Sequence, residues 1–100
     1  MLTKDKILEK LEKNKDKIKS LGVKKLILFG SYAKNTATAK SDIDFLVRFE
    51  KGRGLFEDFV HLLDLLEKMF HKKIDLVKPH LVRKELKKEI LRGKQIEAKI

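Results

Sequence analysis

The residues with the clearest chemical potential are a glycine and a serine followed, after ten intervening positions, by two aspartates one residue apart: Gly30, Ser31, Asp42 and Asp44. A glycine at a strand end lets the backbone approach a bulky anion, and a helix turn after it offers N–H groups and a hydroxyl to phosphate oxygens. Two aspartates at this spacing on a strand project to one side, about 7 Å apart along the backbone, and can converge on divalent cations. The stretch therefore predicts a phosphate cradle beside a metal site.

A third carboxylate, Asp75, lies in a short apolar run that we expect to form a strand beside that of the two aspartates. There it could bind a second ion or take the proton from an attacking hydroxyl. Oxygen ligands of this kind suit magnesium, which usually keeps waters and substrate phosphates in its remaining positions. The histidines lack metal-site spacing, so we expect ordinary surface positions for His61, His71 and His80.

Hydrophobic periodicity predicts the elements that must position these residues. Apolar runs and alternation predict strands over 23–29, 42–49 and 73–77, with a further edge strand in the tail 94–100. Helical spacing predicts one amphipathic helix from Thr3 to Gly22, a core helix over 55–70, and a helix that starts at Pro79 and ends at Gly93. Residues 31–34 should form a short helix turn, and 35–41 a surface loop.

This order of elements predicts the α/β (α+β) class, a small mixed sheet covered by helices. A chain of 100 residues fits a single domain, 1–100, with one core. There are no cysteines, which excludes disulfides and thiolate chemistry. No apolar run is long enough to span a bilayer, so we expect a cytoplasmic protein without a membrane partner.

The charge of the chain is unevenly distributed. There are 25 Lys and Arg against 15 Asp and Glu, which gives a net charge of +10. Residues 26–67 hold five basic and seven acidic residues, whereas both ends are strongly basic. Such a balance favours an anionic partner such as a nucleotide, a nucleic acid or an acidic protein face.

The segments Phe29–Lys34 and Ser41–Val47 resemble the signature of the nucleotidyltransferase superfamily of the DNA polymerase beta type. Within it the chain is similar to the minimal nucleotidyltransferase (MNT) subgroup, small proteins encoded beside HEPN-domain partners. The resemblance extends over about residues 23–93 and includes the third carboxylate in Lys73–Val77. It implies the polymerase beta-like nucleotidyltransferase fold.

The resemblance also implies roles for individual residues. Asp42 and Asp44 would bind Mg²⁺, Asp75 would complete the acidic triad, and Gly30 and Ser31 would hold the triphosphate of ATP. The implied function is that of an antitoxin of a type VII toxin–antitoxin pair. It would transfer AMP from ATP to a tyrosine of its HEPN toxin, a ribonuclease, with release of pyrophosphate.

The chain departs from the family pattern at three positions. Family members often carry Arg at the positions of Tyr32 and Lys34 and Gly at that of Asn35. Lys34 keeps the positive charge for nucleotide binding without the bidentate fork of arginine. Larger relatives have an additional acceptor-binding domain, for which 100 residues leave no room, so another protein should bring the acceptor.

Two other functions fit the sequence. The chain could be an antitoxin that acts by binding and occluding the toxin, with an inert or regulatory nucleotide site. It could also be a nucleic-acid-binding domain that uses its basic ends, although stacking platforms are sparse because Tyr32 is the only tyrosine. The sequence leaves open whether the chain forms a homo-oligomer or a hetero-oligomer with the toxin.

Overall fold

The computed structural model describes residues 1–100 and contains four strands and six helical segments. The strands are β1 (Val23–Phe29), β2 (Ile43–Phe49), β3 (Ile74–Val77) and β4 (Ile96–Glu97). The α-helices are α1 (Lys4–Lys13), α2 (Lys15–Ser20), α3 (Gly30–Ala33), α4 (Phe56–Phe70) and α5 (Lys84–Arg92). A short 3₁₀ helix, η1 (Pro79–Leu81), lies between β3 and α5. The expected α/β class and the expected order of elements are confirmed.

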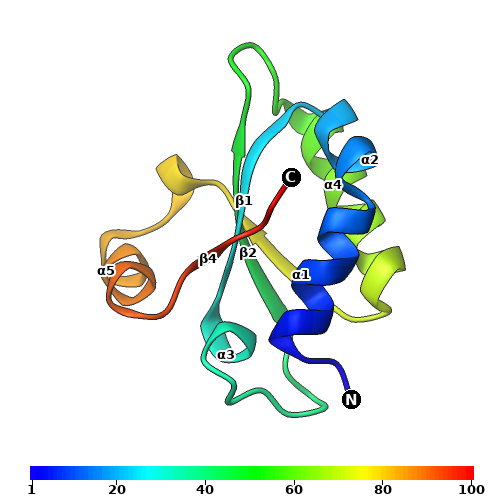
Figure 1. Cartoon of the computed structure of the whole chain (residues 1–100). Coiled ribbons are helices and arrows are strands. Elements are labelled where there is room, and N and C mark those ends of the chain that lie inside the picture. The colour runs from blue at the N-terminus through cyan, green and yellow to red at the C-terminus, as the bar shows by residue number, and fades with distance from the viewer.

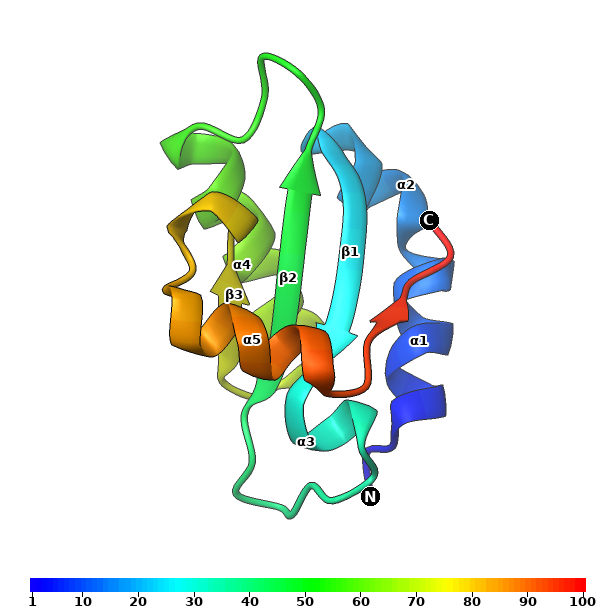
Figure 2. The same ribbon diagram turned by 90° about the vertical axis from the view of Figure 1, so that its left-hand side faces the viewer.

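The strands form one mixed sheet in the order β3-β2-β1-β4. β1 pairs antiparallel with both β2 and β4, whereas β2 and β3 run parallel. The parallel pair is possible because α4 carries the chain back along the sheet between these two strands. As Figure 1 shows, α1, α2 and α4 cover one face of the sheet, and α5 lies over the other. Turning the molecule brings α5 in front of the sheet, next to the end that carries α3 (Figure 2).

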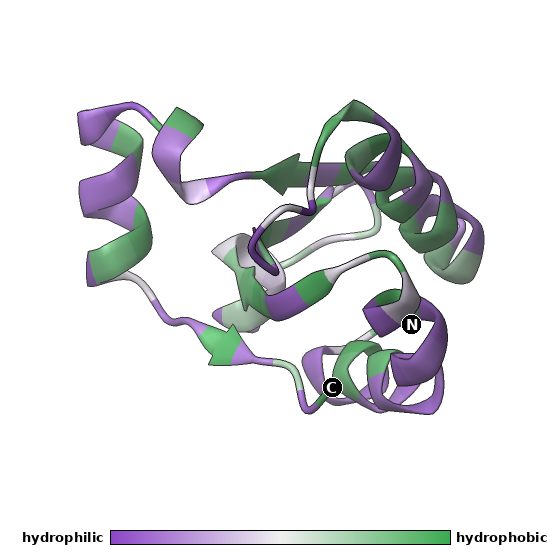
Figure 3. Cartoon of the chain, turned by 90° about the horizontal axis from the view of Figure 1, so that it is seen from above, coloured by the Kyte–Doolittle hydropathy of each residue, from purple (hydrophilic) through white to green (hydrophobic).

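The hydrophobic core lies between the sheet and the three helices of the covered face. Alternation along β2 puts every second residue into this core, because successive strand side chains point to opposite faces. The ten largest side chains that are fully buried come from α1, α2, α4, β1 and β2: Ile7, Leu11, Ile18, Leu26, Leu28, Ile43, Phe45, Val47, Leu62 and Leu66. On the other face of the sheet lie α5, which buries a single residue, Ile90, and the short η1, which contacts β2. Seen from above, α5 stands apart from the other helices and has mixed polar and apolar colouring (Figure 3).

The prediction of a single helix up to Gly22 was wrong, because the segment is two helices that meet at Asn14. The Asn14 side-chain amide donates a hydrogen bond to the Lys10 carbonyl at 2.8 Å, so a side chain competes with the backbone ladder there. The predicted helix from Pro79 to Gly93 is also divided. Val82 and Arg83 are extended, so only η1 begins at the proline, and α5 starts at Lys84.

The prediction that the apolar stripe over 55–70 is core was only partly correct. Leu62 and Leu66 are fully buried, but Leu55 and Phe56 are 77% and 80% exposed. The apolar side chains around the start of α4 are therefore not part of the core. The strand expected in the tail is confirmed as β4, and all three histidines are exposed as expected. None of the helices is both long and apolar enough to cross a membrane.

Candidate active site

Two neighbouring strands place two carboxylates side by side on the sheet face beneath α5. β2 and β3 are in parallel register, and Asp44 lies directly opposite Asp75. Their neighbours Ile43 and Ile74 are buried in the core, so the aspartates point to the opposite face. Asp44 is partly buried and Asp75 is exposed. Strand alternation thus places one acid on each of two neighbouring strands, both on the sheet face beneath α5.

The electrostatic environment of Asp44 disfavours its ionised form. Burial, the negative charge of Asp75, a hydrogen bond with the Asp75 side chain and the charge of Asp42 together raise the pKa of Asp44 to about 6. Like charges placed close together and partly removed from water favour binding of a positive charge. The pair is therefore suited to hold either a proton or a divalent cation.

Gly30 makes room for the Asp44 carboxylate. It directly follows β1 as the first residue of α3 and has a φ of 75°, a left-handed conformation that favours glycine. A β-carbon added at this position would lie 2.1 Å from Oδ2 of Asp44. Sequence reasoning connected Gly30 with an approaching phosphate; the structure shows that the aspartate itself already requires this glycine.

The two aspartates line a cavity of about 220 Å³ between the sheet and α5. Gly30 and Lys34 also line it, so four of the predicted site residues meet there. The Lys34 side chain lies close to Gly93, because a β-carbon added at Gly93 would be 3.3 Å from Cε of Lys34. A lysine side chain thus lines the same cavity as the two acids, where it is suited to bind phosphate.

The cavity also contains residues that sequence reasoning missed. Glu89 and Ile90 come from α5, and Lys94 follows it in the chain. No motif connected them with the aspartates, because their position depends on how α5 folds back over the sheet. The signal for Lys94 in the sequence was that this lysine directly follows Gly93, at which the last predicted helix ends.

Two predicted residues lie outside this cavity. Ser31 is in the first turn of α3 and its hydroxyl makes no hydrogen bond within the protein; its carbonyl accepts one from the Thr36 N–H at 2.9 Å. Asp42 immediately precedes β2 and acts on Asp44 through its charge. Nowhere in the chain do three or more histidine, aspartate or glutamate side chains come together in an arrangement that could hold a metal ion. The shared metal site of Asp42, Asp44 and Asp75 stays a prediction.

The donor set nevertheless fits magnesium. Carboxylate oxygens are the ligands this ion prefers, and it commonly takes only one or two of them from the protein. Asp44 and Asp75 supply two adjacent carboxylates, and the raised pKa of Asp44 marks a place where a positive charge is stabilised. Water and phosphate oxygens could complete the coordination.

Comparison with known proteins agrees with this geometry. The sequence profile of the family described as "Polymerase beta, Nucleotidyltransferase" matches residues 5–99. The protein adenylyltransferase MntA of Thermococcus cleftensis is 33% identical over 93 residues, which cover 92% of this chain and 93% of that protein. A solved minimal nucleotidyltransferase is 32% identical with a TM-score of 0.66, over 87% of this chain and 92% of that one. A chain from a crystal structure of the MntA–HpeT toxin–antitoxin is 26% identical with a TM-score of 0.60, over 96% of this chain and 72% of that one.

Proposed function

Because the chain belongs to the polymerase beta nucleotidyltransferase family and is a minimal member of it, we propose that it is an antitoxin that transfers AMP from ATP to a tyrosine of a HEPN-domain toxin. Adenylyl transfer to a protein is the activity named for the MntA relative, and a toxin–antitoxin assembly is named for one structural neighbour. The HEPN partner and the tyrosine follow from the resemblance to the MNT subgroup. Because ATP is the substrate, the reaction would take place in the cytoplasm.

One observation carries the proposal: Asp44 and Asp75 lie side by side in a cavity that also holds Gly30 and Lys34. A structural role alone does not account for two adjacent acids beside an unpaired lysine, because like charges together are unfavourable without a cation or a proton. Bound Mg²⁺, held by Asp44 and Asp75 with the charge of Asp42 nearby, would neutralise charge that develops on the phosphates.

The chain's own residues account for the rest of the reaction. Lys34 and Lys94 line the cavity and would bind phosphate oxygens, and Gly30 leaves room for the Asp44 carboxylate. The tyrosine oxygen forms a bond to the α-phosphorus while the bond from that phosphorus to the oxygen bridging to the β-phosphorus breaks. Pyrophosphate leaves with the electron pair of the broken bond. A phenol has a pKa of about 10, so its proton needs an acceptor, and we assign this role to the Asp75 carboxylate.

Intact-mass spectrometry tests this proposal directly. The chain is incubated with ATP, Mg²⁺ and the purified HEPN protein encoded beside it, and we expect mass increments of AMP on the HEPN protein. Asp44→Asn should abolish these increments, whereas Asp64→Asn should not, because Asp64 is an exposed residue of α4 that pairs with Lys68. If the ribonuclease is silenced without any added mass, the chain acts by occlusion and the proposal is wrong.

A further inference from the structure

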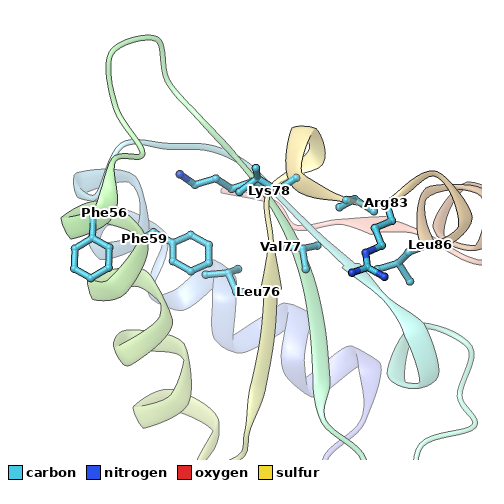
Figure 4. A pocket seen from close by; sticks show the side chains of 9 residues that line it. Phe56, Phe59, Leu76, Val77, Lys78, Arg83 and Leu86 are labelled. Atoms are coloured by element: carbon cyan, nitrogen blue, oxygen red, sulfur yellow. The ribbon is translucent and has the colours of Figure 1, made fainter.

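A second cavity of the molecule is an apolar groove that is distinct from the cavity of the acidic pair. It has a volume of about 450 Å³ and runs along the edge strand β3, between the start of α4 on one side and η1 and α5 on the other. Figure 4 shows Phe56 and Phe59 on one wall, Leu76 and Val77 at the strand, and Leu86 with Arg83 on the opposite wall. Seven of its nine lining residues are hydrophobic. We refer to it as the β3 groove.

The β3 groove leaves large apolar side chains in water. Phe56 is 80% exposed and Leu81 is 71% exposed. A contiguous apolar hollow of this kind, with polar groups at its rim, commonly marks a binding surface. The two polar lining residues are both cations, Lys78 and Arg83, and no carboxylate lines the groove.

Lys78 lines both the groove and a further, basic cavity. This cavity has a volume of about 340 Å³ and contains five residues that carry or can carry a positive charge: Lys24, Arg48, Arg53, Lys78 and His80. No acidic residue lines it. Arg53 is engaged by Asp58 at 2.9 Å, and the Lys78 ammonium lies over the Phe49 and Phe59 rings, whereas Lys24 and Arg48 form no ion pair. The free charges are therefore Lys24 and Arg48.

The groove also adjoins the acidic pair, because Leu86 lines both the β3 groove and the cavity of Asp44 and Asp75. Arg48 is four residues from Asp44 along β2, on the same face of the sheet and about 13 Å away. An apolar hollow thus lies between a basic cavity at one end and the reacting groups at the other.

We propose that the β3 groove and the basic cavity form the docking surface for the acceptor protein, and that they take an acidic segment with apolar side chains. This inference rests on the proposed function, since it identifies how that partner is held. Apolar side chains of the segment enter the groove, its carboxylates face Lys24 and Arg48, and the acceptor tyrosine passes Leu86 to reach the aspartates. Docking beside the site raises the effective concentration of the tyrosine at the α-phosphorus.

Charge and the apolar lining together argue against the other occupants of this surface. A second copy of the chain would bring another +10 charge against the same cations, which is unfavourable. A nucleic acid would satisfy Lys24 and Arg48, but its phosphates would gain nothing from a groove lined by seven hydrophobic residues. Only an acidic chain with apolar side chains satisfies both parts.

The test uses two double variants of exposed residues, Phe56→Ser with Leu81→Ser in the groove and Lys24→Glu with Arg48→Glu in the basic cavity. Matched controls are Leu91→Ser, which removes an apolar side chain that is 64% exposed outside the groove, and Lys19→Glu on the covered face of the sheet. Affinity for the purified HEPN protein and for a non-hydrolysable ATP analogue is measured by calorimetry. We expect the dissociation constant for the HEPN protein to rise at least about tenfold in each double variant, as for loss of interface hot spots. ATP-analogue affinity should stay within about twofold, and the controls should behave as the wild type.

Unchanged HEPN affinity in the groove variant would overturn the inference, as would an equal loss in the Leu91→Ser control. Binding to a short single-stranded RNA is measured in parallel. If the basic-cavity variant loses RNA binding but keeps its HEPN affinity, the cavity is an RNA site and the inference is wrong. If the wild-type complex forms but no AMP is transferred, the proposed function fails, while weaker HEPN binding by both double variants would still support the docking surface.

Discussion

Replacing Asp44 by Asn should stabilise the protein at neutral pH while it destroys the predicted activity. The pKa of Asp44 is raised from 3.8 to about 6, chiefly by burial and by the charge of Asp75. The folded chain therefore holds this proton more tightly than the unfolded chain does. Ionisation of Asp44 costs nothing below a pH of about 4, costs progressively more as the pH rises to about 6, and has its full cost above that. Asparagine does not ionise and avoids this cost.

The magnitude follows from the size of the shift. Two pKa units correspond to about 3 kcal/mol, at 1.36 kcal/mol for each unit. Partial exposure of Asp44 lets solvent screen the interaction, so we expect about 1–2 kcal/mol for the variant. For a 100-residue domain each kcal/mol changes the melting temperature by about 4–8 °C.

The assay is urea denaturation followed by circular dichroism, in the absence of divalent cations, at a pH of about 7.5 and again at about 4. Asp44→Asn should have the higher free energy of unfolding at the upper pH, and the difference should disappear at the lower one. Asp64→Asn serves as the control and should change stability by less than about 0.5 kcal/mol, as exposed ion pairs do. A variant that is no more stable than the wild type at neutral pH, or whose advantage persists at low pH, would refute the electrostatic reasoning.

Three further predictions concern the same site. Asp75→Asn removes the neighbouring charge, so it should lower the pKa of Asp44, which NMR titration can follow, and it should abolish transfer while ATP binding persists. Asp42→Asn should lower the pKa of Asp44 by less, because the charge of Asp42 is the smallest of the four causes of the shift. It should also reduce the transfer rate at least about a hundredfold, because its negative charge helps to bind the metal. Gly30→Ala should lower both stability and ATP affinity, the former by at least about 1–2 kcal/mol for the left-handed backbone alone; an unchanged melting temperature would contradict the close approach to Asp44.

Much of the site could be predicted because strand alternation is a local property. Ile43 and Phe45 had to enter the core, and this alone placed Asp44 on the opposite face. The same reasoning applied to Asp75, between Ile74 and Leu76, although its pairing with Asp44 depended on the parallel register. Period-two patterns thus gave the direction of each side chain without any long-range information.

The parts that could not be predicted depend on contacts between distant segments. Lys94 reaches the cavity only because α5 folds back over the sheet, and no local pattern encodes that return. Phe56 belongs to the regular apolar stripe of α4, but it is exposed. The stripe predicts which side of the helix is apolar, but not how far along the helix the rest of the protein covers that side. The division of the first helix at Asn14 depended on one side-chain hydrogen bond, which hydrophobic spacing does not report.

The close contact between Gly30 and Asp44 has an evolutionary consequence. The aspartate carboxylate occupies the volume that any other residue type at position 30 would need for its β-carbon. Substitutions at these two positions are therefore epistatic: a chain that has lost Asp44 could accept a larger residue at position 30, but a chain that keeps the aspartate could not. Relatives that have lost the acid should accordingly show relaxed selection on the glycine. Sequence variation at position 30 would then identify relatives that have lost the nucleotidyltransferase activity.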